Sequence, residues 1–158
     1  MLPTDWQEVS RIYMEGIATG IATFETTVPG FSAWDAAHMA SCRLVAAEGD
    51  TLMGWAALSP VSSRCVYGGV GEVSIYIGSG FRGKGVGMQL MRALINASEA
   101  ESLWTLQSGI FPQNRGSIIL HEKAGFRYLG KRERIGKRDG IWHDNLLYER
   151  RSNVVGID

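Results

Sequence analysis

Five glycines crowd one short segment near the middle of the chain, and this segment limits the possible folds more than any other feature. Residues 77–87 read Ile-Gly-Ser-Gly-Phe-Arg-Gly-Lys-Gly-Val-Gly. The preceding residues 71–77 alternate apolar and polar side chains, the two-residue period of a strand. After Gly87, apolar residues at helical spacing run to about Ala100. A strand that enters a glycine-rich helix start presents unpaired backbone N–H groups and the positive end of a helix dipole, so the segment predicts a phosphate-binding strand–loop–helix unit.

Two common phosphate-binding loops do not fit this segment. Residues 78–83 match the dinucleotide pattern G-x-G-x-x-G, but that pattern expects an acidic residue at the end of the next strand to bind the ribose. Residues 107–110, where that strand ends, contain no acid, and the helical period begins after Gly87 rather than at Gly80. The nucleotide-hydrolase loop requires Ser or Thr after its lysine, whereas Lys84 is followed by glycine.

The rest of the chain predicts one α/β domain over residues 1–158, because it contains no internal repeat, low-complexity tract or linker. Helices are expected at residues 5–18, from Ser32, at 88–100 and at 117–124, and strands at residues 43–47, 52–58, 71–77, 103–110, 126–135 and 142–148. The last two strands are joined across residues 137–140, whose Asp-Gly pair suits a tight turn. This order indicates a mixed, mostly antiparallel sheet flanked by helices. Residues 1–3 are too few for more than a very short strand before the first helix.

Composition narrows the possible partners. Lys and Arg together number 16, as do Asp and Glu, so the chain lacks the basic excess that nucleic-acid binding or docking on an anionic membrane requires. No apolar stretch approaches the length of a membrane span, and the N-terminus does not resemble a signal peptide. Cys42 and Cys65 are too few for a disulfide scaffold and lack metal-ligand spacing, so we expect a cytoplasmic, metal-free protein, with a single disulfide left open.

Two segments together resemble the signatures of the GNAT superfamily of N-acetyltransferases. Residues 82–87, R-G-K-G-V-G, resemble the superfamily motif Q/R-x-x-G-x-G/A. Residues 114–126, N-R-G-S-I-I-L-H-E-K-A-G-F, resemble its second motif, N-x-x-A/S-x-x-L-Y/H-E-x-x-G-F, and follow at the expected helix-plus-strand distance. The resemblance extends from Thr4 to about Arg150. It implies the acyltransferase fold with splayed central strands, and acetyl-CoA as co-substrate.

The resemblance also implies how coenzyme A is bound. The pyrophosphate would lie on backbone amides of the first signature, where glycines allow close approach and two basic side chains add charge. The pantetheine arm would pair with the exposed strand as a substitute strand. Asn114 would lie near the pantetheine and the thiol at the start of the next helix, where it also suits an N-cap. The implied coenzyme-binding residues are Ser74, Ile75, Tyr76, Ile77, Arg82, Gly83, Lys84, Gly85, Val86, Gly87, Asn114 and Ser117.

Four further segments resemble the subgroup similar to phosphinothricin and methionine-sulfoximine acetyltransferases. They are T-F-E-T at residues 23–26, G-E-V-S-I-Y-I at 71–77, L-H-E at 120–122 and G-I-W-H-D at 140–144, and Arg64 with Tyr67 matches its R-x-x-Y pair. The subgroup implies a small amino-acid-like amine as acceptor and a homodimer with the acceptor pocket near its interface. The substrate-binding candidates are Phe24, Glu25, Trp34, Arg64, Tyr67 and Tyr76. Arg64 suits a carboxylate or phosphinate, whereas each aromatic residue, taken alone, equally suits core packing.

Catalysis would require removal of a proton from the acceptor ammonium and stabilisation of an oxyanion. Glu72 is the candidate base, acting through one or two waters, because alternation places it on the same strand face as Ser74 and Tyr76. A backbone N–H near Ile75 would hold the oxyanion. Asn114 and His121 complete the catalytic set. His121 stands where many members carry a tyrosine acid, and it either protonates the departing thiolate or orients it.

Two alternatives remain open at this stage. The acceptor could be another amine, such as a protein N-terminus, a polyamine or an aminoglycoside. The chain could also be a coenzyme-A-binding module without catalysis. A Glu72→Gln variant that keeps acetyl-CoA binding and loses turnover would distinguish the enzyme from the module.

Overall fold

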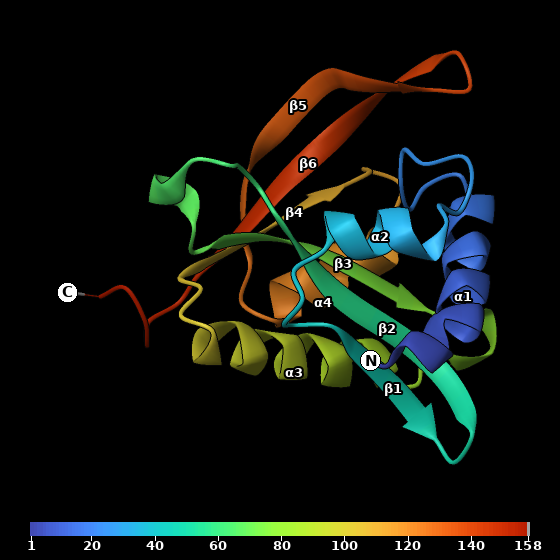
Figure 1. Ribbon diagram of the computed structural model, residues 1–158. Coiled ribbons are helices and arrows are strands. Elements are labelled where there is room, and N and C mark those ends of the chain that lie inside the picture. Colours follow the sequence, from blue (N-terminus) through green and yellow to red (C-terminus); the bar gives the residue numbers. More distant parts are fainter. Residues whose placement is uncertain (158) are drawn as a thin grey trace.

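The computed structural model describes residues 1–157 and contains one six-stranded sheet in the order β1-β2-β3-β4-β6-β5, with helices on both faces (Figure 1). The strands are β1 (Leu44–Glu48), β2 (Thr51–Pro60), β3 (Val70–Ile77), β4 (Thr105–Ile110), β5 (Arg127–Arg138) and β6 (Ile141–Arg151). The helices are α1 (Trp6–Ala18), α2 (Phe31–Ala37), α3 (Val86–Ala100) and α4 (Arg115–Lys123), with 3-10 turns η1 (Pro3–Asp5), η2 (Cys65–Tyr67) and η3 (Ser79–Phe81). The expected α/β architecture is therefore confirmed.

Several boundaries differ from expectation, and β5 and β6, for example, continue to Arg138 and Arg151. The short second helix begins at Phe31 after Gly30, with no side-chain cap, because the Trp34 amide bonds to the Gly30 carbonyl and Ser32 lies inside the helix. β4 begins at Thr105 rather than at residue 103, since the amides of Trp104 and Thr105 both turn to the Gly69 carbonyl. Within residues 1–157, a 3-10 turn rather than a strand precedes α1.

The sheet is forked at its centre. β3 and β4 are the parallel pair, and they are joined only at Val70↔Thr105, Gly71↔Leu106 and Glu72↔Gln107. β3 remains paired with β2 up to Ile77, and β4 remains paired with β6 up to Ile110. Beyond Glu72 and Gln107, the facing backbone edges of the two strands are therefore free of strand pairing. The expected splay of the central strands is confirmed.

A long hairpin of β5 and β6 extends past the rest of the sheet (Figure 1). Arg138 pairs with Ile141, which leaves Asp139 and Gly140 as a two-residue turn. Their φ angles of 48° and 81° are both positive, as a hairpin turn of the primed type requires. The expected Asp-Gly turn is confirmed. The register is irregular between Arg132 and Gly136, so the side chains beyond this point do not follow a simple two-residue alternation.

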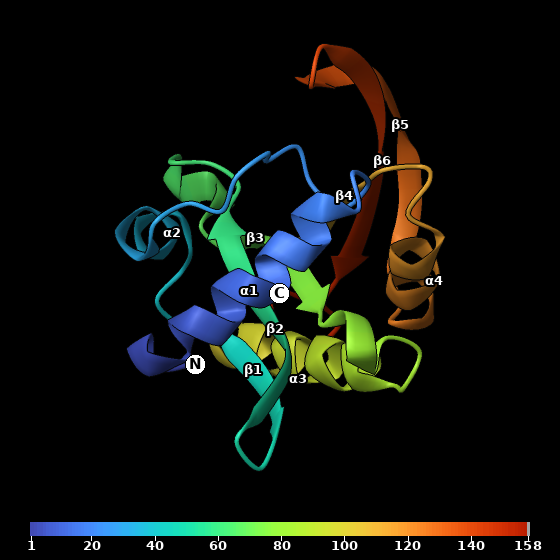
Figure 2. The ribbon, with the colours of Figure 1, turned by 90° about the vertical axis from the view of Figure 1, so that its right-hand side faces the viewer.

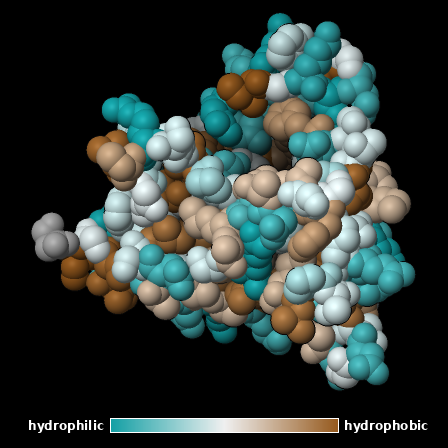
Figure 3. Space-filling view, viewed as in Figure 1, coloured by the Kyte–Doolittle hydropathy of each residue, from teal (hydrophilic) through white to brown (hydrophobic). Residues whose placement is uncertain are grey.

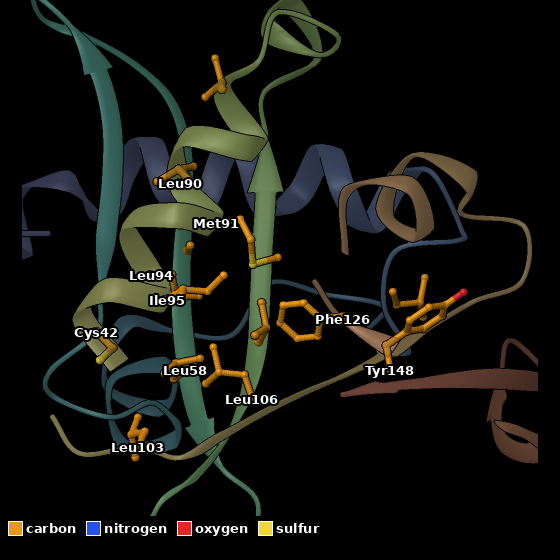
Figure 4. Packing of buried hydrophobic residues seen from close by; sticks show 14 residues of the cluster. Cys42, Leu58, Leu90, Met91, Leu94, Ile95, Leu103, Leu106, Phe126 and Tyr148 are labelled. Atoms are coloured by element: carbon orange, nitrogen blue, oxygen red, sulfur yellow. The ribbon is translucent and has the colours of Figure 1, made fainter. Parts of the chain in front are cut away.

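Two hydrophobic clusters cover the two faces of the sheet. On one face, α3 directs Leu90, Met91, Leu94 and Ile95 toward the strands, at the spacing of one helix face (Figure 4). On the other face, residues of α1 and α2 pack on β2 around the buried rings of Trp34 and Trp55, and the members of this cluster are Val9, Ile12, Tyr13, Ile17, Trp34, Leu52, Trp55 and Ala57. These clusters hold α1 and α3 on opposite sides of β3.

Both cysteines are free, Cys42 being buried and Cys65 exposed, so the single disulfide that the sequence left open is not formed. Of the helices in residues 1–157, none combines the length and the apolar character needed to cross a membrane.

Candidate functional site

A cavity of about 660 Å³ lies where β3 and β4 part. Its walls come from the end of α1 and the loop after it, from β3, β4 and α4, from the loop between β3 and α3, and from the β5–β6 hairpin. Figure 2 shows β3 and the loop that follows it between α1 and α4. The surface view in Figure 3 is hollowed beneath the hairpin, with both hydrophilic and hydrophobic side chains around the hollow. Segments from the whole length of the chain therefore meet at the fork of the sheet.

The glycine loop (residues 78–87) forms one end of the cavity. Gly83 and Gly85 have φ angles of 75° and 85°, in the left-handed region that favours glycine, and a Cβ at either would meet open space. Gly85 is the N-cap of α3, so the free amides of the first helical turn lie beside the cavity. Four of the six predicted phosphate-binding residues line it, namely Arg82, Gly83, Gly85 and Gly87. The other two do not: Val86 is buried in the core, and the Lys84 ammonium lies over the Phe81 ring.

The β3 wall carries the predicted base. Residues 72–77 all line the cavity, and they include Glu72, Ser74 and Tyr76, which alternation places on one face of the strand. The Glu72 carboxylate accepts a hydrogen bond from Gln107 Nε2 at 3.2 Å. Tyr76 stacks on Trp55 with ring centroids 4.8 Å apart, and its burial raises the pKa of its phenol, which therefore stays neutral.

The α4 wall carries Asn114 and His121. Asn114 Oδ1 accepts from the Ser117 amide at 3.2 Å, so the expected N-cap is confirmed. His121 is 1% exposed, packs edge-on against Phe126, and has Nδ1 2.8 Å from the Ser117 carbonyl oxygen. Because a carbonyl only accepts, Nδ1 carries the proton. Burial lowers the pKa of His121, so its ring is neutral near pH 7 and Nε2 carries a lone pair rather than a proton.

Another part of the cavity wall is formed by aromatic rings and by the hairpin. Phe24, in the loop after α1, meets Phe111 edge-on with ring centroids 4.6 Å apart, and both line the cavity. His143 stacks on the same Phe111 at 5.2 Å. Phe24 was predicted at this site, whereas Phe111 follows β4 and has no sequence signature of its own.

Four predicted acceptor residues do not line the cavity. Trp34 is 1% exposed in the core, between Trp6 and Trp55, because α2 packs it against Trp55 of β2. Arg64 and Tyr67 lie on the exposed η2 turn, where the guanidinium covers the phenol ring at 5.6 Å. Glu25 is exposed beside Phe24 but outside the walls. Loop and helix positions such as these depend on packing that the local sequence does not encode.

Two residues of the hairpin line the cavity without having been predicted. Arg132 on β5 and Asn145 on β6 form a cross-strand pair, and Arg132 Nη2 donates to Asn145 Oδ1 at 2.7 Å. They are distant in sequence from both signatures, so only the closeness of β5 and β6 to the fork could have identified them.

Within residues 1–157, no three His, Cys, Asp or Glu side chains gather as metal ligands would. Chemistry without a metal stays a prediction.

Comparison with known proteins gives consistent matches. Residues 6–126 match the acetyltransferase (GNAT) family. A phosphinothricin N-acetyltransferase of Streptomyces coelicolor is 34% identical over 104 residues, which cover 66% of this chain and 61% of that protein. An L-methionine sulfoximine/L-methionine sulfone acetyltransferase of Pseudomonas aeruginosa is 38% identical over 76 residues, 48% of this chain and 44% of that protein. The matched regions thus span less than two thirds of either relative.

Among solved structures, a GNAT superfamily phosphinothricin acetyltransferase from Sinorhizobium meliloti, crystallised with acetyl-CoA, superposes with a TM-score of 0.87. It is 27% identical, and the match covers 100% of this chain and 89% of that one.

Proposed function

This chain belongs to the acetyltransferase (GNAT) family, and on that premise we propose that it transfers the acetyl group of acetyl-CoA to the amino group of a small amino-acid-like acceptor. The observation that carries the proposal is the fork of the sheet, where the Glu72 carboxylate and the glycine loop open into one cavity. Phosphinothricin, methionine sulfoximine and methionine sulfone are the acceptor types that the names of the relatives suggest.

The cavity walls suit coenzyme A. The free amides of the first turn of α3 and the Arg82 side chain would hold the pyrophosphate, with Lys84 adding charge from the loop. The unpaired edge of β3 from Ser74 to Ile77 would take the pantetheine arm as a substitute strand. Asn114 and Ser117, at the start of α4, would lie near the thiol end. Acetyl-CoA supplies an activated acetyl thioester.

Glu72 is positioned to prepare the acceptor. An α-amino group is mostly ammonium at neutral pH and must lose a proton before it can attack. The Glu72 carboxylate would take this proton through one or two waters, and the amine nitrogen would then bond directly to the thioester carbonyl carbon. A backbone N–H of the free β3 edge, near Ile75, would stabilise the oxyanion until the C–S bond breaks and the thiolate leaves.

The hydrogen bonding of His121 favours the orienting role over the acid role. A neutral ring whose only proton is on Nδ1, directed at the Ser117 carbonyl, has none to give from Nε2. The attacking nitrogen becomes positive when it bonds to the carbonyl carbon, and the departing thiolate would take the second proton of that nitrogen by way of water. His121 would instead fix the first turns of α4, and with them Asn114 and Ser117.

A Glu72→Gln variant tests the enzyme proposal against the alternative of a coenzyme-binding module. We expect release of free thiol from acetyl-CoA with methionine sulfone, phosphinothricin or methionine sulfoximine, and at least a 100-fold lower kcat in the variant. Thermal protection by acetyl-CoA should be unchanged, and Glu101→Gln, on the surface beyond α3, should behave as the unsubstituted protein. Thiol release with spermidine, an aminoglycoside or a short peptide instead would favour the alternative acceptors. If no amine releases thiol although acetyl-CoA binds, the result would favour a coenzyme-A-binding module without catalysis.

We further propose that the protein is a cytoplasmic homodimer, as the family resemblance implies. The two free thiols, one of them exposed, are in keeping with a reducing compartment. Large apolar side chains are exposed on the hairpin and on η2, including Val66, Tyr67, Ile135, Ile141 and Trp142. A dimer would cover part of this surface. Sedimentation velocity should give twice the monomer mass, and Trp142→Glu should shift the boundary toward the monomer.

A further inference from the structure

The cross-strand pair Arg132–Asn145 lies on the same face of the sheet as the proposed base. Glu72 pairs with Gln107 across the fork, and Gly109, two residues further along β4, faces the same way. Arg132 and Asn145 lie directly over Gly109, so the pair and the Glu72 carboxylate line one cavity, with β4 between the strands that carry them.

The pair is fitted closely to the strand beneath it. Asn145 is 4% exposed, and its Oδ1 accepts from Arg132 Nη2 at 2.7 Å. A Cβ at Gly109 would stand 2.6 Å from Asn145 Oδ1 and 3.1 Å from Arg132 Nη2. Only glycine at position 109 leaves room for both polar groups at this wall. The hydrogen bond to the uncharged Asn145 amide thus orients the Arg132 guanidinium without neutralising its charge.

The charge of Arg132 has no counter-ion within residues 1–157. The nearby acids of the hairpin are occupied by Lys131, whose Nζ lies 3.3 Å from Glu133 and 3.3 Å from Asp144. Arg64, the residue first expected to bind an anion, lies outside the cavity. A guanidinium presents paired N–H donors that match a carboxylate, so the Arg132 guanidinium, without a counter-ion at the cavity wall, suits an anionic ligand.

We propose that Arg132 and Asn145 form the subsite that binds the carboxylate of the acceptor. The acceptor is then an α-amino acid whose carboxylate meets the hairpin while its amine is turned toward Glu72. This inference rests on the proposed function, because it concerns the acceptor half of that site. It makes Arg132 a specificity-determining residue that separates amino acids from simple amines.

A matched pair of acceptors tests the subsite. L-methionine sulfone and 3-(methylsulfonyl)propylamine differ only by the carboxylate. We expect Arg132→Met to raise KM for the amino acid about 10- to 100-fold, the loss expected for one charge-assisted contact. KM for the amine and for acetyl-CoA should change less than about twofold on the same grounds. Arg132→Lys should be intermediate. Arg127→Met, which removes an exposed arginine of the same strand, is the control.

Asn145→Asp gives an independent variant of the same shape. Its carboxylate would form an ion pair with Arg132 in place of the acceptor carboxylate, so KM for the amino acid should rise while KM for the amine stays constant. Equal changes for both acceptors in Arg132→Met and Asn145→Asp would overturn the subsite, as would equal KM values for the two acceptors in the unsubstituted protein.

Calorimetry separates failure of the subsite from failure of the proposed function. If neither acceptor releases thiol, the proposed function fails, and the subsite is judged by binding of methionine sulfone to the protein saturated with coenzyme A. Binding that requires the carboxylate and is lost in Arg132→Met supports the subsite. Absence of carboxylate-dependent binding overturns it.

Discussion

The side-chain amide of Gln107 donates a hydrogen bond to the carboxylate of Glu72, with Nε2 and Oε2 3.2 Å apart, at the last residue pair that joins β3 to β4. Beyond this pair the two strands separate. The carboxylate is therefore held at the apex of the fork by the neighbouring strand, and it faces the cavity that both strands line.

Loss of this hydrogen bond should slow the reaction without weakening coenzyme binding. In Gln107→Leu the Glu72 carboxylate loses the donor that sets its direction, and a hydrogen bond to a charged group contributes about 1.5 kcal/mol or more. We expect kcat to fall about tenfold, with KM for acetyl-CoA unchanged. Steady-state thiol release measures both. Gln89→Leu on the exposed side of α3 is the control, and an unchanged kcat in Gln107→Leu would show that the contact has no part in catalysis.

Two glycines with positive φ angles allow the effect of a substitution on stability to be distinguished from its effect on coenzyme binding. Gly85 (φ 85°) and Gly49 (φ 56°) both have open space where a Cβ would stand, but Gly85 lines the cavity and Gly49 lies in the β1–β2 turn. Alanine at either should lower stability by about 1 kcal/mol, the cost of a left-handed non-glycine residue. Gly85→Ala alone should also raise KM for acetyl-CoA. Similar KM values for acetyl-CoA in the two variants would show that the glycine loop does not bind the coenzyme.

Gly136 controls the position of the Phe24 ring. A Cβ there would stand 2.6 Å from Phe24 Cε1, so Gly136→Ala must displace a ring that lines the cavity on the side that we propose for the acceptor. We expect a several-fold higher KM for the acceptor and no change in KM for acetyl-CoA. Gly130→Ala, on the same strand and with open space around it, should change neither constant. A change confined to acetyl-CoA would place the acceptor elsewhere.

Two histidines should make stability fall on mild acidification. Burial lowers the pKa of His121 and of His38 below their ordinary value of 6.5. Below that value the histidines of the unfolded chain are protonated, whereas the buried rings of the native protein stay neutral. The contribution of each histidine to the free energy of unfolding is therefore complete above about pH 6.5 and is lost as the pH falls toward the pKa of the folded protein. Thermal unfolding between pH 7.5 and 5.5 should therefore show a decreasing Tm.

His121→Asn keeps an amide donor for the Ser117 carbonyl and removes the titrating ring, so its Tm should fall less over the same range. Hydrogen bonds from the amides of Ser79 and Arg134 lower the pKa values of the Glu15 and Asp144 carboxyls. Their contribution to stability is therefore lost only when the pH falls below the ordinary carboxyl range near 4, outside the range of this experiment. An identical fall in the variant and the unsubstituted protein would exclude His121 as a source of the pH dependence.

Local features of the sequence predicted local features of the structure. The alternation from residue 71 to 77 placed Glu72, Ser74 and Tyr76 on one face of β3, since a strand turns alternate side chains to opposite sides, and all three line the cavity. Asn114 caps α4 and Asp139–Gly140 forms the hairpin turn, because both depend on a few adjacent backbone groups. The family resemblance then supplied the fork of β3 and β4, which no local pattern predicts.

The sequence alone thus determined the elements, the loop between β3 and α3, and the strand face that carries the proposed base. The tertiary structure alone decided which distant side chains share the cavity. The irregular register between Arg132 and Gly136 breaks the two-residue alternation, and the bare backbone of Gly109 admits Arg132 and Asn145 at the wall. Packing against Trp55 likewise takes Trp34 into the core. The reason is physical: periodicity and backbone preference act over a few residues, whereas which side chains meet depends on strand register and on the volume that close packing leaves.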